Sequence, residues 1–580
     1  MLSGYLLCYK RTQGGNVAAR KVKDNEIVIK GTPVVEGIAY APAAWTRRPP
    51  LPPATAPELP EDEREAAYEE FLVASDQVAE GLLARAENAQ GSSKEVLQMT
   101  AGLAKDRGFQ RMVKKDVTKG VPPIQATMAA TEKFVEMFEK AGGLMAERTT
   151  DLRDVRDRII ARLQGLPEPG VPHMPYPIVV MGDDLAPADT AGMNNKDYVA
   201  IVTQGGGPTS HTSIIARQLG IPCIVAARKL EEVEEGVEGL VDGAEGTVTV
   251  GVDPEEALKL VEEDAERVAR IAAWRGPAKT KDGVPVQLLA NIGDVAAAVK
   301  AAETSEAEGV GLFRTELLFL DTPDEPSVES QAANYAAVFN AFPEGKVVVR
   351  TLDAGSDKPV PFATLAEEFN PALGVRGIRV TGHDEGLMLH QLDAIRDAKK
   401  DSPDTAVWVM APMISTLPEA EWFAGLCRDR GLKPGIMIEV PSAVILINKF
   451  MSVVDFVSIG TNDLTQYTMA ADRMSPHLAE YTDPWQPAVL ELIARTAEEG
   501  KSQSKPAGVC GEAAADPTLA CVLIGMGITS LSMASNAISS VGAQLGTVTM
   551  AQCREAASAV RGARDSAEAR ALARAALGQS

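Results

Sequence analysis

Apolar residues recur at helical spacing through the first third of the chain. After residue 61 they fall every three or four positions, with charged residues between them, at Ala67, Phe71, Ala74, Val78 and Leu82. This pattern is typical of an amphipathic helix with one buried face. Helical patterns continue over residues 94–105, 123–140 and 147–163. Four helices with short connections predict a helical bundle over residues 61–163.

Short apolar runs bounded by glycine and proline lie on both sides of this bundle and predict strands. Before the bundle, residues 27–45 favour two short strands. After it, runs occur at residues 177–180, 198–203, 221–225, 239–243 and 246–250. The bundle is therefore expected to be an insertion into an α/β domain formed by residues 27–60 and 164–253. Pro254 follows Asp253 at the first turn of a charged helix, and residues 254–275 are predicted to be a linker.

From residue 276 onward, apolar runs of strand length alternate with helical patterns. The runs are at residues 286–291, 309–314, 346–352, 407–412, 436–440, 456–460, 506–510 and 530–533. Eight strands alternating with helices predict a (β/α)₈ TIM barrel, in which the chemistry lies at the C-terminal ends of the strands. The expected fold class is therefore a multidomain α/β chain that ends in a TIM barrel over residues 276–580.

Composition narrows the classes of partner. The chain has 580 residues, too many for one core, and a net charge of −23. This acidity argues against nucleic acid and anionic membrane surfaces as partners. Six scattered cysteines and the lack of a long apolar run argue against a disulfide framework, a zinc site and membrane insertion, so a cytoplasmic protein is expected. Residues 1–26 are expected to be a flexible N-terminal extension.

A glycine-rich turn places one histidine at the start of a helix. Gly205, Gly206 and Gly207 follow a predicted strand, and His211 begins the helical pattern after them. Glycines let backbone N–H groups approach an anion, and a helix N-terminus adds partial positive charge. Hydroxyl groups are expected around the ring, from Thr209, Ser210, Thr212 and Ser213. This setting suits a histidine that carries a phosphoryl group; the alternative is a capped helix start whose histidine only packs or caps.

Polar and charged residues gather at the predicted C-terminal ends of the barrel strands. They are Arg314, Arg350, Glu439, Asn462, Asp463, Arg473 and Cys510. Three arginines at one mouth form a clamp for a trianion, because guanidinium groups match phosphate and carboxylate geometry. Two carboxylates leave room for a magnesium ion that also takes substrate oxygens. Each arginine alone has the alternative of a surface ion pair, and Cys510 that of a small buried hydrophobe, but their shared end of the barrel favours a site.

Several long segments of the sequence resemble segments of known enzymes. Residues 205–220 resemble the phosphohistidine segment of the phosphoenolpyruvate-utilising enzymes. In the barrel, the resemblance is to the Enzyme I family of the phosphoenolpyruvate-dependent sugar phosphotransferase system (PTS), in residues 313–316, 370–376 and 460–467. The resemblance extends through most of the chain and implies a swivelling phosphohistidine domain with an inserted helical bundle, followed by the barrel.

The resemblance also implies an activity. The enzyme would transfer the phosphoryl group of phosphoenolpyruvate (PEP) to its own His211 and then to a histidine of the carrier protein HPr, releasing pyruvate, as the first general step of sugar uptake. PEP would be bound by Arg314, Arg350, Asn462, Asp463 and Arg473. Glu439 and Asp463 would hold Mg²⁺, and Cys510 would be a proton donor. The bundle of residues 61–163 would dock HPr, and the barrel would form a homodimer.

Two positions depart from the family pattern, and two other classes compete. Ala186 stands where family members often have threonine, and Ser356 where a second glycine is common; both are expected to tune the rate.

A dikinase or synthase would need a large nucleotide-binding module with a glycine-rich phosphate loop, and the residues before the histidine domain are mostly helical and lack such a loop. Loss of His211, Arg473 or Cys510 would favour a non-catalytic sensor, and all three are present.

Overall fold

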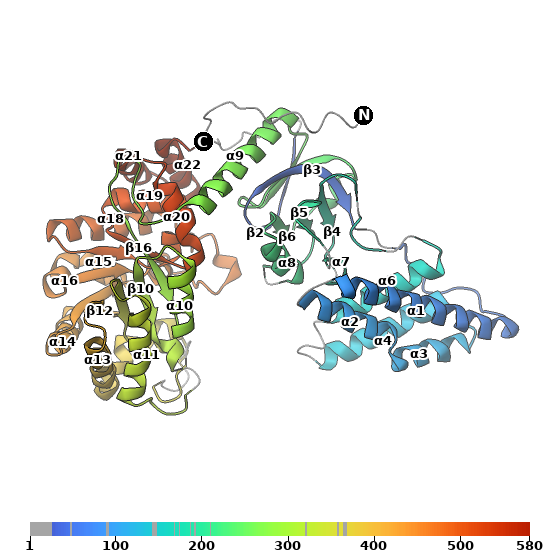
Figure 1. The fold of residues 1–580 in the computed structure, drawn as a ribbon, viewed down its shortest axis with the longest axis horizontal. Coiled ribbons are helices and arrows are strands. Elements are labelled where there is room, and N and C mark those ends of the chain that lie inside the picture. The colour runs from blue at the N-terminus through green and yellow to red at the C-terminus, as the bar shows by residue number, and fades with distance from the viewer. Residues whose placement is uncertain are drawn as a thin grey trace. The chain divides into compact units, whose positions relative to one another are not determined.

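The computed structural model describes residues 26–46, 49–88, 92–141, 148–166, 169–172, 174–185, 187–190, 193–208, 210–319, 322–355, 359–363 and 368–579. They fall into two compact units, the first ending at Ala265 and the second beginning at Glu266 (Figure 1). The expected extension over residues 1–26, apart from Glu26 itself, lies outside the described residues, as do Ala186 and Ser356.

An eight-stranded sheet forms the α/β part of the first unit. Its strands lie in the order β1-β8-β7-β3-β4-β5-β6-β2. The bounds are β1 Ile27–Lys30, β2 Thr32–Val35, β3 Ile38–Trp45, β4 Ile178–Gly182, β5 Tyr198–Thr203, β6 Cys223–Val225, β7 Glu238–Asp242 and β8 Thr247–Val250. Its helices are α7 Pro187–Thr190 and α8 His211–Leu219, and the boundary between the two units falls within α9 Pro254–Ala273. Strands β3 to β6 are parallel, so their C-terminal ends share one edge of the sheet.

The first apolar run forms three strands, where two were predicted. Gly31 separates β1 from β2, and a Cβ atom there would lie 2.6 Å from a methyl carbon of Ile224. Gly37, with φ of +129°, separates β2 from β3. The two breaks send the strands to different partners, because β1 pairs with β8, β2 with β6, and β3 with both β4 and β7.

Five α-helices of the described residues form the bundle, where four were predicted. They are α1 Arg64–Asn88, α2 Ser92–Ala104, α3 Arg107–Val117, α4 Pro123–Ala141 and α6 Thr149–Leu163. The prediction lacked α3, which Asp106 caps by accepting a hydrogen bond of 2.8 Å from the Phe109 N–H. In α3, Phe109, Val113 and Val117 are spaced four residues apart and join the buried core of the bundle. The charged residues between them obscured this face in the sequence.

The second unit is a closed barrel of eight parallel strands, which confirms the predicted fold class. The strands are β9 Gln287–Ile292, β10 Gly309–Arg314, β11 Lys346–Arg350, β12 Ala406–Ala411, β13 Lys433–Ile438, β14 Phe456–Ile459, β15 Ala507–Val509 and β16 Ser530–Met533. Pairing of β16 with β9 closes the ring. Because every strand runs the same way, all eight C-terminal ends open onto one mouth.

Helices surround the barrel (Figure 1). They are α10 Val295–Thr304, α11 Val328–Ala341, α12 Ile378–His383, α13 Glu385–Lys400, α14 Leu417–Arg428, α15 Pro441–Ile445, α16 Ile447–Val453, α17 Thr461–Met469, α18 Pro487–Ser502, α19 Pro517–Met526, α20 Ile538–Leu545, α21 Met550–Val560 and α22 Ser566–Leu577. The main apolar core lies between this helical layer and the strands. Within the described stretches, no helix has the length and apolar character needed to cross a membrane.

A buried ion-pair cluster joins the bundle to the α/β part of the first unit. Arg158 of α6 is fully buried and pairs with Asp154 at 2.8 Å and with Asp189 of α7 at 2.7 Å. Charged groups tolerate removal from water only while they remain paired. The attachment of α6 to α7 therefore depends on the Arg158 guanidinium.

Replacing Arg158 with methionine is expected to destabilise the first unit by about 3–5 kcal/mol, because it leaves buried carboxylates without their cation. The control is Lys140→Met, since Lys140 forms an exposed pair with Glu136 at 4.0 Å and exposed pairs contribute only about 0–1 kcal/mol. Urea unfolding followed by circular dichroism measures both variants. Equal unfolding midpoints for the two would contradict the role assigned to Arg158.

Candidate active site

The glycine-rich turn and helix α8 place His211 at the C-terminal edge of the parallel strands. His211 is the first residue of α8, and Ser210 caps this helix by accepting a hydrogen bond of 3.3 Å from the Ser213 N–H. Gly206 has φ of +81°, a conformation that favours glycine. A Cβ atom at Gly205 would lie 3.0 Å from the Asp183 carbonyl oxygen. The turn thus brings the backbone close to neighbouring strands and leads directly into a helix N-terminus, a favourable place for an anion.

The hydroxyl groups near His211 brace the turn. The Ser213 hydroxyl donates to the Gly207 carbonyl at 2.7 Å, and the Ser210 hydroxyl donates to the Ser213 hydroxyl at 3.1 Å. The Thr212 hydroxyl donates to the Asp184 carboxylate at 2.9 Å. These hydrogen bonds fix the loop and the start of the helix, and the placing of the hydroxyl groups around the imidazole stays a prediction. Thr209, the fourth hydroxyl residue of that prediction, lies outside the described residues.

In the second unit, the seven predicted residues of the barrel follow the C-terminal ends of strands. Arg314 ends β10 and Arg350 ends β11. Glu439 and Cys510 each stand one residue past a strand, after β13 and β15. The remaining three follow β14: Asn462 and Asp463 in the first turn of α17, and Arg473 beyond its end. The single mouth of a parallel barrel brings these elements together.

A network of buried ion pairs organises this mouth. Arg350 pairs with Glu316 at 2.5 Å and with Asp353 at 2.9 Å. Arg376 pairs with Asp353 at 3.1 Å and with Asp463 at 3.0 Å. Burial alone would lower the pKa of both guanidinium groups, but the neighbouring carboxylates raise it above the usual range. Both arginines therefore stay charged and hold the carboxylates in place.

Glu439 is fully buried at the centre of this mouth. Its Oε1 accepts a hydrogen bond of 2.6 Å from the Met413 N–H, while Oε2 is buried and has no hydrogen-bond partner among the described residues. Burial, followed by the charges of Asp463 and Asp353, raises the pKa of Glu439 to about 8, against the opposing effect of Arg350. A cation beside these carboxylates would relieve their repulsion.

The space beside Glu439 depends on glycine. A Cβ atom at Gly460 would lie 2.7 Å from Glu439 Oε2, so any larger residue would displace the carboxylate. Among the described residues, no group of three or more histidine, cysteine and acidic side chains has the arrangement of a complete metal site. Glu439 and Asp463 together supply oxygen ligands for part of one, and a divalent ion that keeps water or substrate oxygens fits such a partial set.

The other predicted residues lie around this centre. Cys510 is buried and its thiol donates to the Ile459 carbonyl at 3.6 Å. Burial raises the pKa of Cys510 to about 11, although nearby Arg350 and Arg314 lower it, so the thiol carries its proton at neutral pH. Arg473 approaches Asp463 at 3.6 Å. Arg314 is exposed at the rim and has no ion-pair partner among the described residues, which leaves its guanidinium available to an anion.

Comparison with known proteins covers nearly the whole chain. The PEP-utilising enzyme N-terminal, mobile and PEP-binding domains match residues 30–148, 174–246 and 269–550, respectively. A phosphoenolpyruvate-protein phosphotransferase of Streptomyces coelicolor is 44% identical over 558 residues, which are 95% of this chain and 99% of that protein. The chain belongs to the phosphoenolpyruvate-protein phosphotransferase family.

Other phosphoenolpyruvate-protein phosphotransferases support the same assignment. The protein of Haloferax volcanii is 39% identical over 466 residues, which cover 78% of this chain and 81% of that protein. The protein of Enterococcus faecalis is 33% identical over 537 residues, which cover 88% of this chain and 92% of that protein. The chain is therefore a PEP-dependent phosphotransferase, as predicted.

Three residues of the phosphotransferase mouth were not predicted: Glu316, Asp353 and Arg376. Arg376 is only 1% exposed and links Asp353 to Asp463. All three lie close to residues or segments that the sequence analysis identified. Glu316 comes shortly after Arg314 and Asp353 shortly after Arg350, and Arg376 ends the segment of residues 370–376. The sequence could have indicated these residues because each is charged and lies just past a strand end or within a segment that resembles the family. It could not indicate which residue each charge pairs with.

Replacing Arg376 with methionine is expected to lower PEP-dependent phosphotransfer by about 100-fold or more, because the displaced Asp353 and Asp463 would misplace the mouth. Arg379→Met is the matched control. Arg379 lies in the first turn of α12, just past Arg376 in the chain, and hydrogen-bonds the Gly374 carbonyl at 3.0 Å instead of the buried carboxylates. Pyruvate release with PEP and HPr present measures both. Wild-type turnover in the Arg376 variant would refute the assignment.

Proposed function

We propose that this phosphotransferase transfers the phosphoryl group of PEP to His211 and then to a histidine of HPr, releasing pyruvate. The observation that carries the proposal is a set of three buried polar atoms at the barrel mouth that lack hydrogen-bond partners among the described residues: Arg350 Nε, Glu316 Oε2 and Glu439 Oε2. Buried polar atoms are nearly always paired. These atoms indicate a site that is completed by a charged ligand.

The arginines suit the phosphate and carboxylate of PEP. Arg314 at the rim, the buried Arg350 and the partly exposed Arg473 offer guanidinium groups at different depths of one mouth. Such groups bind phosphate and carboxylate oxygens with two parallel hydrogen bonds. Asn462 adds an amide, whose Oδ1 accepts from the Glu512 N–H at 3.3 Å and leaves the amide N–H₂ for a substrate oxygen.

Glu439 and Asp463 fit a bound Mg²⁺ ion. Oε2 of Glu439 has no hydrogen-bond partner among the described residues, and the charge of Asp463 raises the pKa of Glu439. When bound, Mg²⁺ would neutralise charge on the phosphoryl group and the enolate. The chain's own part is to hold the two carboxylates in position through Arg376 and the Met413 N–H.

Cys510 is proposed as the proton donor. Phosphoryl transfer leaves the enolate of pyruvate at the mouth. The S–H bond of Cys510 breaks as a C–H bond forms at the methylene carbon, which gives pyruvate and a thiolate. The raised pKa of the thiol keeps the proton on sulfur until this step.

His211 and the PEP residues belong to different compact units. His211 must meet PEP at the barrel mouth and HPr at the helical bundle, so the proposal includes a swivel of the histidine unit between two positions. The barrel is proposed as the contact of a homodimer, by family resemblance.

His211→Ala is expected to abolish acid-labile phosphate on the protein, because the imidazole is the proposed acceptor. His390→Ala is the control, since His390 is an exposed histidine that contacts Glu325 at 3.1 Å. Phosphate incorporation from labelled PEP without HPr measures this half-reaction. Label retained by the His211 variant and lost by the His390 variant would reverse the assignment.

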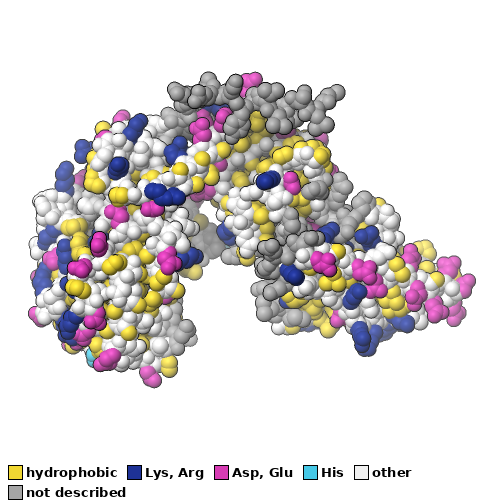
Figure 2. Space-filling view, viewed as in Figure 1, with side chains coloured by type: hydrophobic (Ala, Val, Ile, Leu, Met, Phe, Trp, Pro, Cys, Tyr) yellow, Lys and Arg dark blue, Asp and Glu magenta, His cyan; other side chains and the backbone are white. Residues whose placement is uncertain are grey.

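HPr docking is proposed near α2 of the bundle. Helix α2 packs against α7, which packs against α8, the helix that begins with His211. This is the side of the bundle from which a carrier reaches the histidine. Met99 on α2 is 38% exposed, and Figure 2 shows apolar side chains scattered among charged ones over the bundle. A small apolar patch with a polar rim suits a transient complex.

Met99→Asp is expected to slow phosphoryl transfer to HPr by about tenfold, because a charge in an apolar contact costs about 1–3 kcal/mol. Labelling of His211 from PEP should be unchanged. The control is Met137→Asp on α4, where Met137 is 54% exposed. Rapid-quench transfer from the phosphorylated enzyme to HPr tests the pair. An effect confined to the Met137 variant would place the docking face elsewhere on the bundle.

A further inference from the structure

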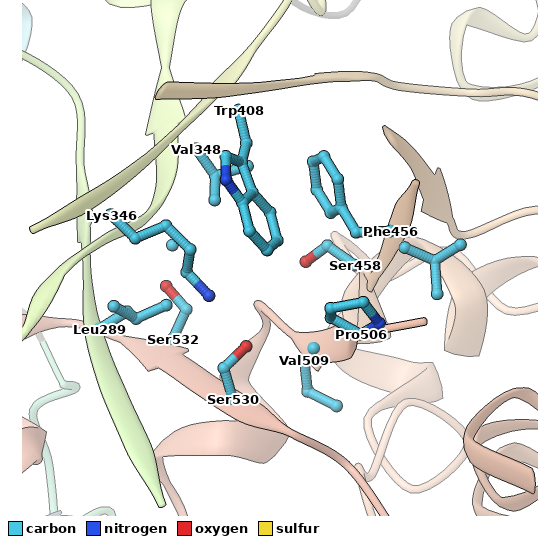
Figure 3. Close-up of a pocket in the computed structure, with 13 residues that line it drawn as sticks. Leu289, Lys346, Val348, Trp408, Phe456, Ser458, Pro506, Val509, Ser530 and Ser532 are labelled. Carbon is cyan, nitrogen blue, oxygen red and sulfur yellow. The ribbon is translucent and has the colours of Figure 1, made fainter. Parts of the chain in front are cut away.

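The barrel interior contains a second polar space, near the N-terminal ends of the strands. The first residues of β11 and β16, Lys346 and Ser530, line it together with Ser458 and Ser532. Figure 3 shows the Lys346 amine and the three hydroxyl groups directed into the same space. The volume open to the centre of a water molecule there is about 20 Å³, so the space can hold at least one water.

Small residues keep this space open. A Cβ atom at Gly508 would lie 2.7 Å from Ser530 Oγ and 4.0 Å from Ser458 Oγ. A side chain at this position would therefore enter the gap between the two hydroxyl groups. An apolar layer of the barrel interior, with Leu312, Met410 and Met437 among its members, also contains Cys510. The polar space and the thiol thus occupy neighbouring levels of one barrel.

Ser458 connects the two levels. It stands in β14, lines the polar space and pairs in register with Gly508, two residues before Cys510. The next residue of β14, Ile459, accepts a hydrogen bond of 3.6 Å from the Cys510 thiol, and the Ser458 hydroxyl lowers the pKa of this thiol against the effect of burial. The Cys510 thiol thus has a hydroxyl group of the polar space in its surroundings. A hydroxyl group both donates and accepts hydrogen bonds, so it is able to pass a proton on.

Lys346 lies at the outer end of the same space. Its Nζ donates to Gln287 Oε1 at 2.5 Å and lies 4.8 Å from the centre of the Trp408 ring, while Lys433 Nζ lies 3.7 Å from that centre. Burial and the charge of Lys433 lower the pKa of Lys346 to about 8, although Glu308 opposes them. The Lys346 ammonium therefore releases and regains a proton near neutral pH.

We propose that Lys346, water in the polar space and Ser458 resupply the proton that Cys510 gives to the enolate. This rests on the proposed role of Cys510. The thiolate takes the proton of the Ser458 hydroxyl, the Ser458 oxygen takes one from water, and the water takes one from the Lys346 ammonium. Lys346 recovers its proton from solvent at the N-terminal end of the barrel. One proton enters for each proton delivered to carbon, and no electrons are exchanged.

The route separates proton supply from substrate exchange. Cys510 is only 3% exposed, and PEP or pyruvate at the mouth would cover its accessible side. Ser458 lines the polar space in the barrel interior and lowers the pKa of the Cys510 thiol. Reprotonation then proceeds while product is still bound or while the mouth is covered.

The test is the time course of pyruvate formation with PEP, Mg²⁺ and excess HPr. In Ser458→Ala and Lys346→Met, the first turnover should match the wild type, because Cys510 begins protonated, and later turnovers should slow by about tenfold. Ser532→Ala is the matched control, since this hydroxyl lines the same space and hydrogen-bonds Asn291 and the Ala290 carbonyl. It should keep wild-type kinetics in every turnover.

The pH profile gives a second readout, which a packing defect would not produce. Wild-type later turnovers should fall as pH rises through about 8, where Lys346 loses its proton. Removing the like charge in Lys433→Met should raise the pKa of Lys346 and move this fall to higher pH. Methylammonium should restore later turnovers in Lys346→Ala.

Two results would overturn the proposal in distinguishable ways. Slow turnover in Cys510→Ala, with normal later turnovers in both Ser458→Ala and Lys346→Met, would show that Cys510 is refilled from the mouth. Unchanged turnover in Cys510→Ala would refute its role as donor and the route with it. Circular dichroism of each variant checks folding, and the Lys346 variants keep the test valid if Ser458→Ala does not fold.

Discussion

The mouth of the barrel depends on the pairing of buried arginines with buried carboxylates. Glu316, Asp353, Glu439 and Asp463 would repel one another strongly in an environment from which water is excluded. Arg350 and Arg376 hold them by sharing Asp353 between two guanidinium groups. The arrangement exists before any substrate arrives, so little reorganisation is left for the chemical step.

Some buried polar atoms of the mouth have no hydrogen-bond partner among the described residues, and their chemistry indicates what a ligand would supply. Among the residues that the structure describes, Arg350 Nε has no acceptor, and Glu316 Oε2 and Glu439 Oε2 have no donor. A ligand that satisfies all three must bring an acceptor for the Arg350 N–H group and a donor or a cation for the two carboxylate oxygens. A phosphorylated acid together with a divalent metal ion meets this demand, which agrees with the family to which the chain belongs.

The sequence predicted functional residues well where they lie at the ends of strands. It predicted less well those residues whose role depends on a contact with another side chain. Apolar runs placed all eight barrel strands, and their ends identified Arg314, Arg350, Glu439 and Cys510. The helix α3 was missed because charges surround Phe109, Val113 and Val117. The partners of Arg376, the hydrogen bond from Thr212 to Asp184, and the effect of Ser458 on Cys510 each join residues that are distant in sequence. No single-chain pattern encodes such pairings.

Insertion of the bundle between β3 and β4 affects how the first unit acquires its fold. The helices of the bundle contact neighbours in sequence, whereas β3 must wait for β4, and β1 must wait for β8 at the other end of the unit. Local contacts form quickly and distant strand pairs slowly. During synthesis the bundle is therefore complete before the sheet that carries His211 closes. The edges of β1, β2 and β3 stay unpaired for that interval, which opens them to chaperones or to wrong strand partners.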